Sequence, residues 1–224
     1  MIATQQGTAL ITGASSGIGA VYADRLARRG FDLVLVARNR DRLQALAGKL
    51  AADTGRKIET IAADLTNQKD IARVEAAIRT NSGLTMLVNN AGVGATAPLL
   101  ASDIEKMEEM IAINVNAPTR LTYAAAPGFV ARGAGTIVNI SSIVGVSPET
   151  LNGVYGGSKA FVLALSQSLQ HELADKGVRV QAVLPGATAT GFWDAAGLPL
   201  HNVPREWVMT AEDMVDASLA GLDQ

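Results

Sequence analysis

The 224-residue chain contains no cysteine, which excludes disulfides, thiol catalysis and thiolate metal ligands. Its two histidines, His171 and His201, lack the spacing of a common zinc site, and the Asp and Glu residues form no ligand cluster. We therefore expect no metal. Neither sign of charge is in excess, with 19 Lys and Arg against 21 Asp and Glu. This balance argues against a nucleic-acid or membrane-surface partner that is recruited by charge.

Long apolar runs are also missing. None approaches the length of a membrane span, and the N-terminus lacks the basic start and apolar core of a signal peptide. We therefore expect a cytoplasmic protein. Aromatic residues make up only 4% of the chain, whereas Ala, Gly, Val and Leu are abundant. That composition suits helices packed closely on a parallel sheet.

The sequence instead shows a regular alternation of two kinds of segment. Apolar runs rich in β-branched residues, typical of buried strands, recur at Thr8–Thr12, Asp32–Ala37, Ile58–Ala63, Met86–Asn89, Thr136–Ile140 and Val178–Leu184. Stretches with helical spacing lie between them, at Ile18–Arg29, Arg40–Ala52, Asn67–Arg79, Ile104–Arg132 and Val154–Lys176. The alternation predicts one α/β domain, a doubly wound parallel β-sheet with helices on both faces, in a Rossmann-like three-layer sandwich.

Two regions depart from this alternation. Residues 186–205 have weak periodicity and several Gly and Pro residues, which predicts a long loop and a substrate lid at about 186–209. The chain stops at Gln224 after the sixth predicted strand. Sheets of this kind often have a further strand there, so a C-terminal truncation is left open, and residues 1–224 are taken as one domain.

A glycine-rich segment, Gly13–Gly19, follows the first predicted strand and opens the first predicted helix. Glycines let the backbone turn tightly and approach a ligand closely. The start of a helix offers free N–H groups and a positive dipole end, which suit a pyrophosphate. The spacing G-x-x-x-G-x-G differs from the common G-x-G-x-x-G fingerprint, and a purely structural turn is the alternative.

The second predicted strand ends in Val36-Ala37-Arg38. NAD-binding folds usually carry an acidic residue near this position, where it holds a ribose hydroxyl. Arginine instead forms a charged fork suited to phosphate. The sequence therefore predicts NADP as the preferred cofactor, with NAD as the second option, and Ser15 would add a hydroxyl donor to the 2′-phosphate. The alternative is that Arg38 simply ends the strand and faces water.

Tyr155 and Lys159 are four residues apart and share one face of a predicted helix. A nearby ammonium lowers the pKa of a phenol, and such a tyrosine can exchange a proton with an alcohol or ketone oxygen. The pair alone is a weak signal, because a packed Tyr beside a solvated Lys is common. The segments Ser141–Ser142 and Asn89–Gly92 end strands at the carboxyl edge, where ligands bind in such sheets.

Taken together, these motifs resemble the short-chain dehydrogenase/reductase family over essentially the whole chain. The segment Thr12–Gly19 matches the family's cofactor motif, and Asn89–Gly92 matches its second motif. Pro185-Gly186 matches the motif after the sixth strand, with Thr190 at the customary threonine.

The resemblance implies a catalytic set of Asn114, Ser142, Tyr155 and Lys159. Ser142 is preferred to Ser141 because the family's serine usually lies three residues before a glycine and thirteen before the tyrosine.

By this resemblance, Tyr155 is the general acid or base, and Lys159 lowers its pKa and binds the nicotinamide ribose. Ser142 orients the substrate oxygen, and Asn114 helps to hold a water that links Lys159 to solvent. Pro118 has no N–H to donate to the Asn114 carbonyl, so that carbonyl would be free for the water if one helix contains both residues. A simple kink at Pro118 is a compatible alternative.

The resemblance also implies a set of cofactor-binding residues, in which Asp64 and Leu65 lie near the adenine and Thr188 and Thr190 near the carboxamide and phosphates. Asp64 has an alternative role as the cap of a helix that starts near Asn67. The full set is Gly13, Ser15, Ser16, Gly17, Ile18, Gly19, Arg38, Asp64, Leu65, Asn90, Ala91, Gly92, Tyr155, Lys159, Pro185, Gly186, Thr188 and Thr190.

The expected function is NADP(H)-dependent hydride transfer between nicotinamide and a carbonyl or alcohol substrate. The alternative is a catalytically silent regulatory or scaffold protein that binds the cofactor with the same fold. The lid aromatics Phe192, Trp193 and Trp207 either line the substrate site or pack the lid on the core. A homodimer or homotetramer is implied by resemblance, through the two long helices. The sequence names neither the substrate nor the direction of reaction.

Overall fold

A computed structural model describes residues 6–223 of the chain. Its central sheet has six strands. They are β1 (Thr8–Thr12), β2 (Asp32–Ala37), β3 (Ile58–Ala62), β4 (Leu84–Asn89), β5 (Gly135–Ile140) and β6 (Val178–Val183).

The strands lie in the order β3-β2-β1-β4-β5-β6, and every neighbouring pair is parallel. The order reverses between β1 and β4, and sheets of this kind bind their ligands outside the carboxyl ends of the strands at such a reversal. The doubly wound parallel sheet predicted from the sequence is therefore confirmed. The predicted strands are also found, and their ends shift by one or two residues, with Leu84 and Gly135 as earlier starts.

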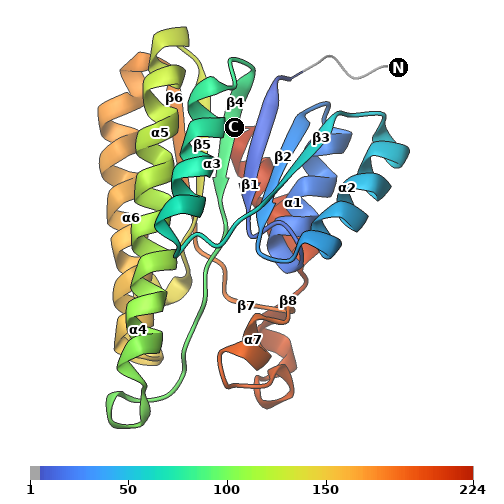
Figure 1. Ribbon diagram of the computed structural model, residues 1–224. Helices are drawn as coiled ribbons and strands as arrows, with labels where there is room; N and C mark the ends of the chain where they lie inside the picture. The colour runs from blue at the N-terminus through green and yellow to red at the C-terminus, as the bar shows by residue number, and fades with distance from the viewer. Residues whose placement is uncertain (1–5, 224) are drawn as a thin grey trace.

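Eight α-helices accompany the sheet in the described part of the chain. They are α1 (Gly17–Arg28), α2 (Arg40–Thr54), α3 (Gln68–Thr80), α4 (Ile104–Ile111), α5 (Ala117–Arg132), α6 (Gly153–Leu173), α7 (Phe192–Ala195) and α8 (Ala211–Leu222). Figure 1 shows α1, α2 and α8 on one face of the sheet and α3, α5 and α6 on the other.

Two apolar cores separate the sheet from its helix layers. In β1, Ala9 and Ile11 pack with the residues of α1, α2 and α8, whereas Leu10 packs with those of α3 and α5. This alternation follows the pleat of the strand, whose successive side chains point to opposite faces. Because both faces are covered, the central strands are apolar along their whole length.

The stretch Ile104–Arg132 was predicted as one helix, and the structure divides it. A π-helical turn, η2 (Ala112–Asn116), joins α4 to α5, and the Ala117 N–H donates to the Ala112 carbonyl five residues earlier. Pro118, at the second position of α5, has no N–H for a regular helical bond. Asn114 lies within this π-turn, a kind of feature that often marks functional sites.

The predicted long loop over residues 186–205 is also corrected. Strands β7 (Ala187–Thr188) and β8 (Val208–Met209) pair in parallel, and α7 lies between them with the 3₁₀ turns Leu200–Asn202 and Arg205–Trp207. Strands of two residues are too short to produce a periodic pattern. In Figure 1 this lid lies beyond the carboxyl ends of the central strands.

Candidate active site

The loop from β1 to α1 requires its glycines. Gly13 and Gly17 have φ values of +65° and +54°, which L-residues with side chains rarely adopt. A Cβ atom at Gly19 would lie 2.4 Å from the Gly13 carbonyl oxygen, and one at Gly17 would lie 3.2 Å from Thr190 Cγ2. The loop is therefore a bare backbone cradle directly beside the lid.

The start of α1 differs from the starts of four other helices. Ser16 precedes α1, but its side chain makes no capping hydrogen bond, and the first turn has no acidic residue. By contrast, α2, α3, α4 and α8 each have an acidic residue in the first turn and a side-chain cap, from Asn39, Asn67, Asp103 and Thr210. The start of α1 is thus suited to an anion, because the helix dipole there lacks a negative partner in the chain.

The loop after β4 is tied to the glycine loop. Asn90 Nδ2 donates to the Thr12 carbonyl at 2.8 Å and to the Gly13 carbonyl at 3.2 Å. The Thr12 hydroxyl accepts from the Asn90 and Ala91 N–H groups, both at 3.0 Å. A Cβ atom at Gly92 would approach Asn114 Oδ1 at 3.0 Å and Lys159 Nζ at 3.5 Å. The structure therefore brings the glycine loop, the second motif and the predicted catalytic residues into one region.

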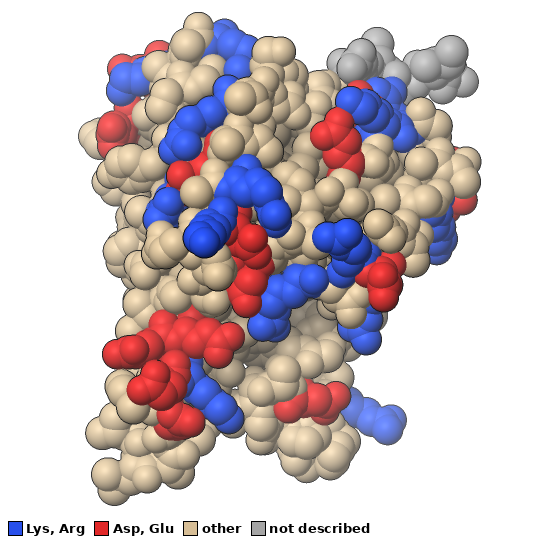
Figure 2. Space-filling view, viewed as in Figure 1, with Lys and Arg blue, Asp and Glu red and all other residues tan. Residues whose placement is uncertain are grey.

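Arg38 follows β2 at the same edge of the sheet, with a side chain that is 62% exposed. Its Nη1 lies 3.9 Å from Glu109 Oε1 of α4. Figure 2 shows acidic side chains gathered over α4. The exposed acids of this helix and its cap are Asp103, Glu105, Glu108 and Glu109. The Arg38 guanidinium is exposed enough to bind a phosphate, but the Glu109 carboxylate beside it would compete with that phosphate.

Asp64 does not cap α3, which corrects one alternative from the sequence. Asn67 caps that helix by accepting from the Lys69 and Asp70 N–H groups. The Asp64 carboxylate instead accepts from the backbone and hydroxyl of Thr66. Burial works to raise the pKa of Asp64, but these bonds and the Arg38 charge together hold it below its usual value. The neighbouring Leu65 side chain is buried in the core on the α3 face.

Asn152 positions α6, the helix that contains the predicted catalytic Tyr155 and Lys159, and it was not predicted from the sequence. Its Oδ1 accepts from the Val154 and Tyr155 N–H groups, which caps α6. Its Nδ2 donates to the Ala97 carbonyl at 2.6 Å and to Ser102 Oγ at 3.0 Å. An Asn just before an apolar helical stretch is a cap signal that could have identified it. The contact with residues about fifty positions earlier had no signal in the sequence.

Tyr155 lies in the first turn of α6 and is only 6% exposed. Burial raises the pKa of its phenol, and a hydrogen bond with the Ser142 side chain partly opposes that rise. Ser142 Oγ also donates to the Pro185 carbonyl at 3.4 Å. Ser141 Oγ instead donates to the Lys159 carbonyl at 2.7 Å and so anchors α6. Of the two serines, Ser142 is the one that meets the phenol.

The Lys159 ammonium is buried one helical turn beyond Tyr155. Its Nζ donates to the Ile140 carbonyl at 3.0 Å and lies 5.9 Å from the centroid of the Tyr155 ring. Burial lowers the pKa of Lys159 to about 8. The chain alone therefore raises the pKa of Tyr155 rather than lowering it, because loss of solvent outweighs the hydrogen bond with Ser142.

The side chain of Asn114 makes three hydrogen bonds with other residues of the chain. Its Oδ1 accepts from the Val93 N–H, and its Nδ2 donates to the Val93 carbonyl and to Ser158 Oγ. Ser158 in turn donates to the Tyr155 carbonyl at 2.8 Å. Asn114 therefore holds the loop after β4 against the catalytic helix, and Ser158 is a second positioning residue that the sequence analysis missed.

The segment after β6 closes the site on the lid side. The Pro185 carbonyl accepts from the Ile143 N–H at 3.0 Å, which joins it to the turn after Ser142. Thr188 Oγ1 donates to the Gly186 carbonyl, and Thr190 lies over Gly17. Of the residues implied after the sixth strand, Thr190 thus lies at the glycine loop and Pro185 lies at the turn after Ser142.

Residues 6–223 contain neither a group of metal-binding side chains nor a membrane-spanning helix. No three His, Asp or Glu side chains in this range are grouped so that they could hold a metal ion. No helix in the same range has both the length and the apolar character of a membrane span.

Known proteins resemble the chain along most of its length. Residues 7–198 match the family model described as short chain dehydrogenase. A short-chain dehydrogenase from Sphingobium yanoikuyae, solved in complex with NADPH, is 49% identical, with a TM-score of 0.94 over 97% of this chain and 84% of that one. A bulky-bulky ketone specific alcohol dehydrogenase from Comamonas testosteroni is 46% identical, with a TM-score of 0.89 over 98% of this chain and 84% of that one.

A more distant relative is the very-long-chain 3-oxoacyl-CoA reductase of Anas platyrhynchos, which is 36% identical. The match covers 81% of this chain but only 60% of that protein. The family model and the two solved structures agree with the doubly wound parallel sheet of this chain. The chain belongs to the short-chain dehydrogenase family of oxidoreductases.

Proposed function

We propose that the protein is an NADP(H)-dependent oxidoreductase that interconverts a ketone and an alcohol, with Tyr155 as the general acid or base. The observation that carries the proposal is the buried pair of Tyr155 and Lys159, one helical turn apart, in which the Lys159 ammonium lies 5.9 Å from the centroid of the Tyr155 ring. A scaffold protein would need no such cluster of proton-exchanging groups at the end of a ligand crevice. The alternative of a silent binding protein is therefore not favoured.

The glycine cradle fits the pyrophosphate of a dinucleotide, because side chains at Gly13, Gly17 or Gly19 would occupy the space of the loop or of its neighbours. Arg38 would pair with a 2′-phosphate, and the Sphingobium relative was solved with NADPH. When bound, NADPH supplies the hydride for the carbonyl carbon and leaves as NADP⁺.

In ketone reduction, the Tyr155 hydroxyl gives its proton to the carbonyl oxygen, which becomes the alcohol. Ser142 donates a hydrogen bond to the same oxygen and holds it near the phenol. The Lys159 charge favours the phenolate that remains, and it lies close enough to bind ribose hydroxyls beside Gly92. In the reverse direction the phenolate takes the alcohol proton.

The surroundings of Tyr155 support an apolar substrate. Its ring lies in a cluster separate from the two main cores, with buried Met107, Met110 and Val144. The partly buried members are Val93, Ala95, Leu151, Val154 and Phe192. The Comamonas relative is named for bulky ketones, and we propose ketones with apolar substituents as the substrate class here.

The proposal is tested by NADPH oxidation with a panel of apolar ketones, for wild type and Tyr155→Phe. The phenylalanine keeps the ring and removes only the hydroxyl, so turnover should fall about a hundred- to ten-thousand-fold. Cofactor affinity, measured by nicotinamide fluorescence, should stay within a few-fold. Tyr123→Phe is the matched control, because Tyr123 is 70% exposed on α5.

Turnover by Tyr155→Phe within a few-fold of wild type would contradict the role of Tyr155. Tight NADPH binding by wild type with no oxidation by any ketone, and no NADP⁺ reduction by any of the matching alcohols, would instead favour the silent cofactor-binding protein.

A further inference from the structure

Phe192, the first residue of α7, extends from the lid to the catalytic tyrosine. The centroids of the Phe192 and Tyr155 rings are 5.8 Å apart, and their planes are inclined by 44°. Both side chains belong to the apolar cluster described above. The Phe192 ring therefore borders the place where a substituent of the substrate would lie, next to the phenol.

The ring has a defined seat on Gly94. A Cβ atom at Gly94 would lie 2.2 Å from Phe192 Cζ and 2.9 Å from Cε2, which is closer than atoms can approach. The backbone of Gly94 is not in the left-handed region, so its own conformation does not call for glycine. The glycine at this position is explained by the ring that rests on it.

Several contacts hold the lid in this position. Phe192 packs edge-on against Trp193, whose Nε1 donates to the Thr188 carbonyl at 2.8 Å. Thr96 Oγ1, in the loop that contains Gly94, donates to the Ala196 carbonyl at 3.0 Å. The first of these hydrogen bonds lies within the lid, and the second joins the lid to the loop after β4.

We propose that Phe192, seated on Gly94, is a specificity-determining residue that limits the size of the ketone substituent lying under the lid. This inference rests on the proposed function and adds to it the residue that forms one wall of the substrate site, beside Tyr155. The wall is apolar and aromatic, so it accepts a small apolar group beside Tyr155 and rejects a larger one. The second substituent of the ketone would extend away from this wall.

The test uses NADPH oxidation with acetophenone, propiophenone and butyrophenone, in which only the alkyl substituent grows. For Phe192→Ala we expect the ratio of kcat/KM for butyrophenone over acetophenone to rise at least about tenfold, because these ketones differ by two methylenes and a pocket discriminates at least about tenfold per methylene. NADPH affinity should stay within a few-fold, which also shows that the variant is folded. Gly94→Ala displaces the same ring without removing it and should change the ratio at least about threefold.

The double variant of Phe192→Ala with Gly94→Ala distinguishes the contact between Gly94 and the ring from any other effect of substituting Gly94. Once the ring is absent, adding Gly94→Ala to Phe192→Ala should leave the ratio unchanged. Two controls change matched residues outside the seat. Gly191→Ala adds a methyl group with no atom within 4 Å, and Trp207→Ala removes a lid aromatic that is 70% exposed. Both should keep the wild-type ratio.

An active wild type whose ratio stays within about twofold in Phe192→Ala would overturn the role of Phe192 and leave the proposed function standing. An effect of Gly94→Ala that is equally large without the ring would overturn the seat. If wild type reduces none of the three ketones, the proposed substrate class fails and the inference fails with it.

Discussion

The ammonium of Lys159 is a charge held in a buried site. Burial lowers its pKa from 10.5 to about 8, so across this interval the unfolded chain binds more protons than the folded one. The free energy of unfolding therefore rises with pH over the same window. In Lys159→Met this contribution is lost. We expect the stability difference between wild type and variant to change by roughly 2–3 kcal/mol from about pH 7 to about pH 10, in favour of wild type.

Urea unfolding at several pH values measures this difference. Tyr22, whose pKa is raised by burial to about 12, lowers stability as pH rises above its ordinary value, but it is present in both proteins and cancels. Lys49→Met, at an exposed lysine of α2, is the control and should show no such change. Parallel pH profiles for wild type and Lys159→Met would contradict the buried charge.

Arg38 would pair either with the 2′-phosphate of the cofactor or with the neighbouring Glu109 carboxylate. A charge-assisted hydrogen bond contributes roughly 1.5–3 kcal/mol, or about ten- to a hundredfold in affinity. Arg38→Ala should weaken NADPH binding by about that factor and leave NADH unchanged, with a smaller effect at high salt because the side chain is 62% exposed. Fluorescence titration of both cofactors at low salt measures the change.

Glu109 provides an opposite test of the same position. Its carboxylate lies 3.9 Å from Arg38 Nη1 and would repel a 2′-phosphate, so Glu109→Gln should strengthen NADPH binding a few-fold.

The combined change of Ala37→Asp with Arg38→Ala should reverse the preference toward NADH. Equal affinity of the unaltered protein for NADPH and NADH would refute the role of Arg38.

At the scale of elements, the β1–α1 loop gives the sharpest test. Gly17→Val introduces a side chain at a φ of +54° and directs it toward Thr190, so NADPH affinity should fall at least about tenfold. Gly48→Val, in α2, is the matched control because nothing lies within 4 Å of the added Cβ and Gly and Val differ little in helix propensity. Unchanged affinity in a folded Gly17→Val protein would mean that the loop does not hold the pyrophosphate.

Helix and strand positions were predictable where local signals were strong. The inner strands β1, β2, β4 and β5 appear as apolar runs because both sheet faces are covered, whereas the edge strands β3 and β6 carry the exposed Glu59 and Arg179. The division of the long helix was not predicted, because the π-turn at Ala112–Asn116 depends on how Asn114 engages the Val93 backbone. The short strands β7 and β8 were missed because they are stabilised by each other rather than by a local pattern.

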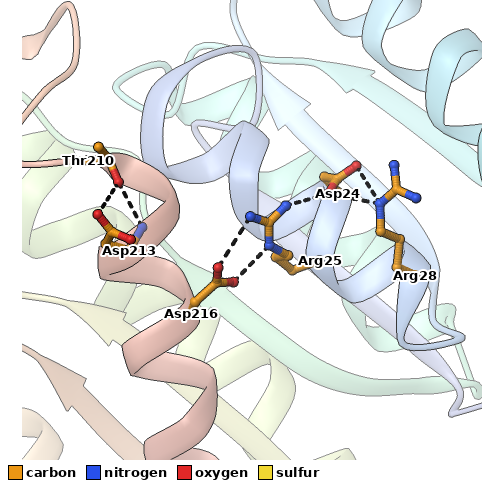
Figure 3. A network of polar contacts seen from close by, with 6 residues as sticks. All are labelled: Asp24, Arg25, Arg28, Thr210, Asp213 and Asp216. Carbon is orange, nitrogen blue, oxygen red and sulfur yellow. Dashed lines mark hydrogen bonds and ion pairs between the residues drawn. The ribbon is translucent and has the colours of Figure 1, made fainter.

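At the scale of the whole molecule, the first and last helices are joined in two ways. On the surface, Arg25 of α1 pairs with Asp216 of α8 at 2.7 Å, and Figure 3 shows Arg25 between Asp24 and Asp216. In the interior, the Tyr22 hydroxyl donates to Ser218 Oγ at 2.6 Å, and Ser218 donates to Gln181 Oε1 at 3.1 Å. The buried bonds link α1, α8 and β6.

We expect the buried link to contribute more than the surface pair. Ser218→Ala would leave the Tyr22 hydroxyl buried without this partner and should cost about 1–3 kcal/mol of unfolding free energy. Tyr22→Phe leaves Ser218 bound to Gln181 and should cost about 0.5–1.5 kcal/mol. Arg25→Ala should cost under about 1 kcal/mol, because the pair is exposed. Urea unfolding ranks the three, and an Arg25→Ala effect larger than that of Ser218→Ala would reverse this assignment.

The sequence by itself determined the parallel sheet, the glycine loop and the candidate catalytic residues. The sheet, the loop and the Tyr155–Lys159 pair depend on features that are close together in the chain, whereas Asn114 and Ser142 were assigned by resemblance to the short-chain dehydrogenase/reductase family. The motif order then placed them at one edge of the sheet, since parallel strands share their carboxyl edge.

Only the tertiary structure decided the relations between distant segments. Asn152 caps α6 and reaches Ala97, Phe192 rests on Gly94 beside Tyr155, and Glu109 approaches Arg38. The direction of the Tyr155 pKa also follows from burial, which is set when α4, α6 and the lid pack together. No local pattern carries these relations, because each is a contact between side chains that the chain brings together only after folding.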